Sequence, residues 1–92
     1  MKCSVETAVR LYYEKPELGT AEIKELFGEE RSPSYIAMKK RQARLIMSER
    51  EALTSEPHMV NTECAYAAWG IDVVDLEQRY KKLKRLELIR NV

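Results

Sequence analysis

A chain of 92 residues is long enough for one compact domain, or for two very small units that share a core. Hydrophobic residues make up 45% of it and only three glycines and three prolines interrupt it, so the composition excludes a disordered chain. No apolar run approaches the roughly 20 residues of a transmembrane helix, and the N-terminal segment lacks the apolar core of a secretion signal. We therefore expect a cytoplasmic protein. The net charge of +1 excludes a chain that is strongly basic or strongly acidic throughout.

Two helices are predicted in the first third of the chain. The first covers residues 5–14, where apolar side chains recur at helical spacing, and Pro16 ends it. The second covers residues 21–27 and follows Thr20, a residue type that caps helix N-termini. Gly28 then ends it, because glycine readily adopts the left-handed conformation found at helix C-termini.

The third predicted helix is unusually long. Ser32 followed by Pro33 is a strong start signal, with a capping residue and then proline at the first helical position. No helix breaker follows before Leu53, which gives a helix of roughly 21 residues and about 30 Å. Residues 54–58 then read as a linker.

Two more helices are predicted after the linker, and strand patterns are nearly absent. The fourth covers residues 63–69, with Thr62 as its cap, and ends at Gly70. The fifth begins after Asp72 and extends towards Ile89. Its inward stripe is predicted to consist of Val73, Leu76, Tyr80, Leu83, Leu86 and Ile89.

The chain also has the pattern of an internal repeat. Residues 20–28 read TAEIKELFG and residues 62–70 read TECAYAAWG, so a helix-capping threonine and an aromatic-glycine pair recur 42 residues apart. Beyond the glycines the alignment continues if the second turn is two residues shorter, which places Ser32 on Asp72. Chance alignment of two amphipathic helices remains the alternative.

A short helix, a glycine turn and a basic helix form the outline of a helix-turn-helix. We therefore predict an all-α fold of five helices, in which two tandem helix-turn-helix-like units share the long central helix. The predicted organisation is a first unit at 1–53, a linker at 54–58, and a second helical pair at 59–92.

Positive charge concentrates on the second helix of each predicted unit. Residues 33–50 carry five basic side chains and one acidic one, and residues 73–92 carry six basic and three acidic. Residues 1–31 and 51–72 carry more acidic than basic side chains. A helix-turn-helix meets phosphate and base edges at its second helix, so this distribution favours DNA binding over the alternative of a merely solvated helix face.

The segments AEIKELFG and RSPSYIAMKKRQAR carry a resemblance over about residues 5–45. They resemble the small helix-turn-helix domains of bacterial phages and mobile elements, such as excisionase-like regulators and the N-terminal domains of terminase small subunits. The resemblance implies a trihelical DNA-binding domain acting in transcription, recombination or DNA packaging. It also implies contacts from Ser34, Tyr35, Lys39 and the neighbouring arginines. The turn GEERS and the overlong third helix depart from that pattern.

The start of the third helix is predicted to enter the major groove, and the arginines around it to contact phosphates. The complete predicted DNA-binding set is Arg31, Ser32, Ser34, Tyr35, Met38, Lys39, Lys40, Arg41, Gln42 and Arg44. Packing at the rim is the alternative role for Tyr35 and Met38, and an ion pair within its own helix is the alternative for Arg44. A secondary basic patch on the fifth helix consists of Arg79, Lys81, Lys82 and Arg85.

Other functional classes lack the residues they would need. Cys3, Cys64 and the lone His58 do not have metal-ligand spacing, so we expect reduced packing cysteines and no metal. Without a phosphate-binding glycine loop or a nucleophile with an orienting base, we expect neither a cofactor nor enzymatic activity. The expected partner is double-stranded DNA rather than a membrane, with a homodimer formed through the long third helix or the C-terminal helix. The alternative is a helical protein-protein interaction module, an adaptor without nucleic acid.

Overall fold

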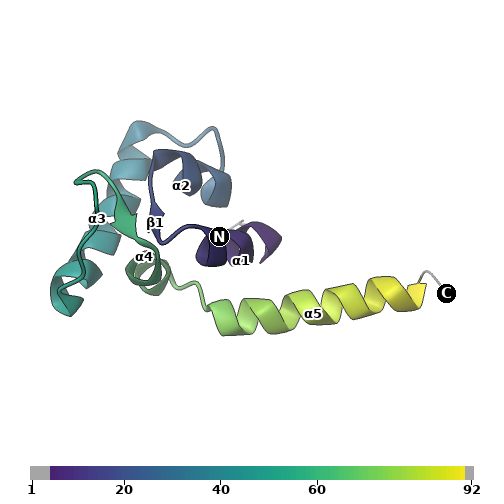
Figure 1. The fold of residues 1–92 in the computed structure, drawn as a ribbon. Coiled ribbons are helices and arrows are strands. Elements are labelled where there is room, and N and C mark those ends of the chain that lie inside the picture. The colour runs from purple at the N-terminus through teal and green to yellow at the C-terminus, as the bar shows by residue number, and fades with distance from the viewer. Residues whose placement is uncertain (1–4, 91–92) are drawn as a thin grey trace.

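The computed structural model describes residues 5–90, with side-chain positions through residue 87. The predictions for Cys3 and for the Ile89 side chain lie outside that description. Five helices form nearly all of the regular structure, which confirms the all-α fold class (Figure 1). The elements in chain order are α1 (Val5–Glu14), β1 (Glu17–Leu18), α2 (Thr20–Phe27), α3 (Pro33–Arg50), β2 (Val60–Asn61), α4 (Thr62–Trp69) and α5 (Val73–Arg90).

The two predicted threonine caps are wrong, because Thr20 and Thr62 are the first helical residues of α2 and α4. Asn61 caps α4, and its side-chain oxygen accepts the backbone N–H three residues on at 3.0 Å. Gly19 precedes α2 and has no side chain that could cap the helix, so the capping contact comes from a helix side chain to the Gly19 backbone. The Glu22 carboxylate accepts the Gly19 N–H at 2.7 Å. In each case the chain enters the helix one residue earlier than the threonine pattern predicts.

The start of α3 is as predicted and its end is not. The Ser32 hydroxyl accepts a backbone N–H in the first turn at 3.2 Å, and Pro33 is the first helical residue. The helix ends at Arg50 rather than Leu53, because Glu51 adopts the left-handed conformation (φ 55°, ψ 35°) that closes the last turn. The chain then turns back towards β2.

A short antiparallel pairing of β1 with β2 joins the two halves of the chain. Leu18 pairs with Val60, and both side chains are fully buried. Thr62 reinforces the junction by donating its hydroxyl to the Lys15 carbonyl at 2.5 Å and its N–H to the Pro16 carbonyl at 3.1 Å. Strands of two residues contain no alternating pattern, so the sequence does not predict them.

The predicted linker is also fastened to β1. The backbone N–H and the hydroxyl of Ser55 both donate to the Glu17 carboxylate, the hydroxyl at 2.6 Å. These two hydrogen bonds hold the pKa of the Glu17 carboxyl below its usual value.

We expect the stabilising effect of Glu17 to disappear in acid. Its pKa is lower in the folded chain than in the unfolded one, so the contribution is complete above the unfolded-state pKa and is lost as the pH falls through the folded-state pKa. The stability difference between the wild type and Glu17→Gln should therefore shrink between about pH 5 and pH 3. Urea unfolding at each pH measures it, and parallel curves would show that the Ser55 contact is not formed in solution.

One hydrophobic core draws on both predicted units. Every helix except α5, both strands and the turn after α4 contribute to it. Its residues are Ala8, Leu11, Leu18, Ile23, Leu26, Phe27, Ile36, Ala43, Val60, Ala65, Tyr66, Trp69 and Ile71. Two polar side chains form hydrogen bonds across this core. The Tyr66 hydroxyl donates to the Ala8 carbonyl at 2.6 Å, and the Trp69 indole N–H donates to the Lys39 carbonyl at 2.9 Å.

The predicted inward stripe of α5 holds only for its first half. Val73 and Leu76 pack against the core, whereas Leu83 and Leu86 are 50% and 52% exposed. The main packing partner of α5 is α1, and α1 has 10 residues against the 18 of α5. The end of α5 therefore extends beyond the rest of the molecule (Figure 1).

The two halves have matching elements. A strand of two residues, a helix of eight, a glycine and a helix of 18 occur in each, with the second turn two residues shorter. Residues 42 positions apart also meet: Leu18 pairs with Val60, and the Phe27 ring packs edge-to-face on Trp69 with centroids 5.4 Å apart. This local two-fold relation ends at the glycines, because α3 packs across α4 whereas α5 packs along α1.

Candidate nucleic-acid interface

The N-terminal end of α3 lies at the surface. Residues 31–34 are all exposed, including Ser34, which is predicted to contact bases. The inner side of α3 is fixed to the rest of the molecule, since Ile36 is buried in the core and the Lys39 carbonyl accepts the Trp69 indole N–H. The long helix therefore presents its first turn and its outer side to solvent.

A basic groove of about 370 Å³ runs between α2 and α3. Pro33, Ile36 and Ala37 line it together with Thr20, and its cationic side chains are Lys24, Lys40 and Arg44. The Lys40 ammonium donates to the Thr20 hydroxyl at 3.0 Å, and Arg44 donates to the Pro57 carbonyl at 3.3 Å. Arg41 is exposed and follows Ala37 by one helical turn, so it continues the positive surface along α3.

No carboxylate neutralises the cations of this surface among the described residues. Within residues 5–90, none of the set Lys24, Lys40, Arg41 and Arg44, called here the α3 basic cluster, forms an ion pair. By contrast, Arg10 lies 2.5 Å from Glu25 and Arg79 lies 3.0 Å from Asp75. The uncompensated charge of the α3 basic cluster is available to an anionic partner.

Arg31 and Lys39, also predicted to contact DNA, lie on a different side of α3. Arg31 stacks on Tyr35, with its guanidinium carbon 4.6 Å from the ring centroid, and its Nε–H donates to the Phe27 carbonyl at 3.0 Å. The Lys39 ammonium lies 4.5 Å from the Phe27 centroid. Burial, and then the charge of Arg31, lower the pKa of Lys39. Two residues advance a helix by about 200°, so Lys39 and Arg41 point in nearly opposite directions.

The other predicted contact residues have intermediate positions. Tyr35 is half-buried and packs edge-to-face on Phe27 with centroids 6.0 Å apart, and Met38 and Gln42 are half-buried as well. Ser32 is exposed, but its hydroxyl is engaged as the helix cap. The structure thus brings together Lys40, Arg41 and Arg44 and separates them from Arg31, Tyr35 and Lys39.

Lys24 is the one member of the α3 basic cluster absent from the predicted set. It lies on α2, whose eight residues include two glutamates, so nothing in that segment marks it as part of a basic surface. Only the packing of α2 against α3 brings it to the groove that Lys40 and Arg44 also line. A local sequence pattern contains no such signal.

The predicted secondary basic patch does not form a comparable surface. Arg79, Lys81, Lys82 and Arg85 are exposed and, at about 100° per residue, they lie within roughly 160° of the circumference of α5. Arg79 is also paired with Asp75. The patch thus lies on one side of a single helix, whereas Lys24, Lys40 and Arg44 line a groove between two helices.

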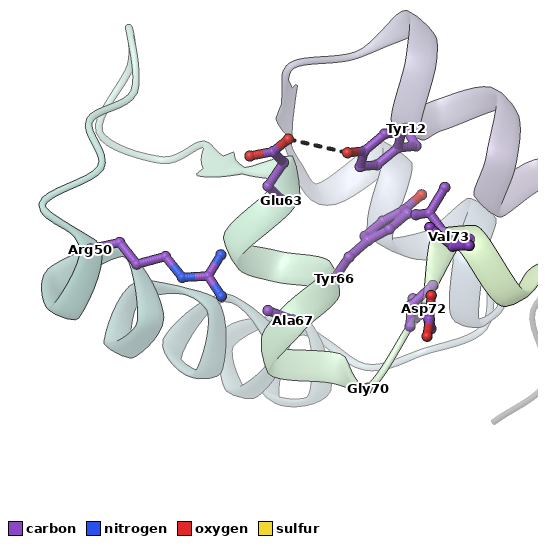
Figure 2. A pocket seen from close by; sticks show the side chains of 10 residues that line it. Tyr12, Arg50, Glu63, Tyr66, Ala67, Gly70, Asp72 and Val73 are labelled. Carbon is purple, nitrogen blue, oxygen red and sulfur yellow. Dashed lines mark hydrogen bonds between the residues drawn. The ribbon is translucent and has the colours of Figure 1, made fainter.

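A larger groove, of about 530 Å³, lies between α1, α4 and the start of α5 (Figure 2). Its lining includes the aromatic rings of Tyr12 and Tyr66, the acidic residues Glu63 and Asp72, and Arg50 from the end of α3. The Tyr12 hydroxyl donates to the Glu63 carboxylate at 3.1 Å, which raises the pKa of Tyr12. With two carboxylates and one guanidinium, this groove does not suit a phosphate backbone.

Other site types have little support in residues 5–90. No three histidine, cysteine, aspartate or glutamate side chains there gather closely enough to hold a metal ion, and Cys64 is a buried free thiol. None of the helices in that range is both long and apolar enough to cross a bilayer. No protein-family model, curated protein sequence or solved structure matches the chain.

Proposed function

We propose that this chain binds double-stranded DNA through α3 and the groove between α2 and α3, as a non-enzymatic protein of helix-turn-helix type. The observation that carries the proposal is the α3 basic cluster, four cations without a carboxylate partner beside an exposed helix start. The resemblance of residues 5–45 to phage and mobile-element domains suggests a role in transcription, recombination or DNA packaging.

In the proposed complex the first turns of α3 enter the major groove. Ser34, Ala37 and Arg41 lie on the exposed side of the helix at spacings of three and four residues, so they face the bases or the near edge of the backbone. Lys24, Lys40 and Arg44 flank this side and contact phosphates. Lys39 is left out of the proposed contacts because its ammonium is held over Phe27.

The proposal predicts a salt-dependent affinity that the α3 basic cluster controls. Changing Lys24, Lys40, Arg41 and Arg44 together to alanine should weaken binding to a mixed-sequence duplex at least about tenfold at 100 mM salt, because each lost phosphate contact reduces counterion release. The slope of log affinity against log salt should fall by roughly 0.9 for each contact that is lost. Fluorescence anisotropy of a labelled duplex across a salt series measures both quantities.

A matched variant controls for net charge. Changing Lys15, Arg50, Lys81 and Lys84 to alanine also removes four positive charges, all from exposed positions outside the α2–α3 groove. This variant should retain most of the wild-type affinity and slope. Equal losses in the two variants, or no salt-dependent duplex binding by the wild type, would refute the proposal and favour the predicted adaptor.

A further inference from the structure

The outer half of α5 has apolar side chains with no neighbour to cover them. Leu83 and Leu86 are about half exposed, whereas the first half of α5 packs along α1, where the Tyr13 hydroxyl donates to Glu77. Exposed leucines on a free helix are an interaction surface when a partner helix can cover them. The distribution of charge along α5 indicates the charge pattern of that partner helix.

Acidic and basic residues are segregated along this helix. Residues 72–78 contain Asp72, Asp75 and Glu77 and no basic residue, whereas residues 79–86 contain five basic residues and no acidic one. One ion pair bridges the two segments within the chain, between Asp75 and Arg79. The segment at 72–78 is therefore negative and the segment at 79–86 is strongly positive.

We propose that α5 pairs in antiparallel orientation with α5 of a second copy of this chain. A two-fold axis near Tyr80 places the acidic segment at 72–78 of each copy beside the basic second half of α5 of the other, and it also opposes the helix dipoles. A parallel pair would instead align like charges. The inference does not rest on DNA binding.

The residues of the proposed contact share one side of α5. Asp75, Arg79, Leu83 and Leu86 recur at intervals of three and four residues, and Lys82 flanks them. In the antiparallel pair the leucines of each copy lie against the other helix, and Asp75 of each copy lies near Lys82 and Arg85 of the other. At 18 residues, α5 spans about 27 Å, which is long enough for such a pairing.

Sedimentation equilibrium of the full chain tests the apolar part of this contact. The wild type should dimerise with rising concentration, and Leu83→Ser with Leu86→Ser should raise the dimer dissociation constant at least about tenfold. The matched control is Leu45→Ser with Leu53→Ser, since these leucines are 65% and 89% exposed at other places. The control should leave the constant unchanged. A monomeric wild type, or a control that weakens the dimer as much, would overturn the proposal.

Charge exchange tests the orientation, and it is independent of whether the serine variant folds. Asp75→Lys alone, and Lys82→Glu with Arg85→Glu alone, should each be monomeric because each places like charges opposite one another. An equimolar mixture of the two variants should form a heterodimer, since both sets of opposite charges are then restored. A mixture that stays monomeric would overturn the antiparallel pairing.

Discussion

Replacing Trp69 with alanine is expected to lower the free energy of unfolding by about 3–5 kcal/mol. The side chain is only 8% exposed and lies where α2, α3 and α4 meet. Its ring packs against Phe27, and its indole N–H donates to the Lys39 carbonyl at 2.9 Å. The substitution leaves a cavity at this junction and removes the hydrogen bond between α4 and α3. Guanidinium unfolding followed by circular dichroism measures the loss.

Two controls separate the contributions of Trp69. Trp69→Phe keeps an aromatic ring against Phe27 but cannot donate to Lys39, so it should cost about 1–2 kcal/mol. Leu53→Ala changes a side chain that is almost fully exposed and should change stability by less than about 0.5 kcal/mol. If Trp69→Ala cost no more than Leu53→Ala, α4 would not anchor α3 as the structure shows.

The helices of this fold could be predicted because their boundaries depend on local chemistry. Ser32 with Pro33 starts α3, and Asp72 caps α5 by accepting the Asp75 N–H at 3.2 Å. Gly28 and Gly70 end the short helices as predicted, but only Gly70 does so in the predicted left-handed conformation. Each of these signals acts within four residues, a distance over which sequence and structure are directly linked.

Features that depend on contacts between distant segments could not be predicted in the same way. The pairing of β1 with β2 involves two residues on each side, too few for a strand pattern. The apolar spacing of α5 correctly identifies one side of a helix, but it does not reveal that α1 is too short to cover that side as far as Leu83 and Leu86. Periodicity gives a direction for a side chain and not the neighbour it meets.

The same limit explains how the candidate interface differs from its prediction. The sequence places Lys39, Lys40 and Arg41 side by side, and all three count equally as positive charge. In the structure, the Lys39 ammonium lies over Phe27, while Lys40 and Arg41 are directed to the groove and the outer side of α3. Lys24 joins them from α2. Charge density along the chain therefore located the helix that carries most of the α3 basic cluster, and tertiary packing determined which cations share one surface.

Replacing Gly28 with alanine should destabilise the fold by about 2–3 kcal/mol, although the glycine is partly exposed. Its backbone has φ 128° and ψ 136°, a conformation that residues with a Cβ rarely adopt. An added Cβ would also lie 2.5 Å from a carboxylate oxygen of Glu30. This turn sets the direction in which α3 leaves α2, so the strain falls on the helix that carries the candidate interface. Thermal and urea unfolding measure the effect.

Gly70 provides a matched control within the same chain. It occupies the equivalent place after α4, but its φ of 73° and ψ of 26° lie in the left-handed region, and nothing lies within 4 Å of an added Cβ. Gly70→Ala should therefore cost only about 1 kcal/mol. Combining Gly28→Ala with Glu30→Ala removes the carboxylate contact and should restore only a small part of the loss, because the backbone strain remains. Equal losses at Gly28 and Gly70 would show that the two turns, despite their different lengths, impose the same constraint on the helices that follow.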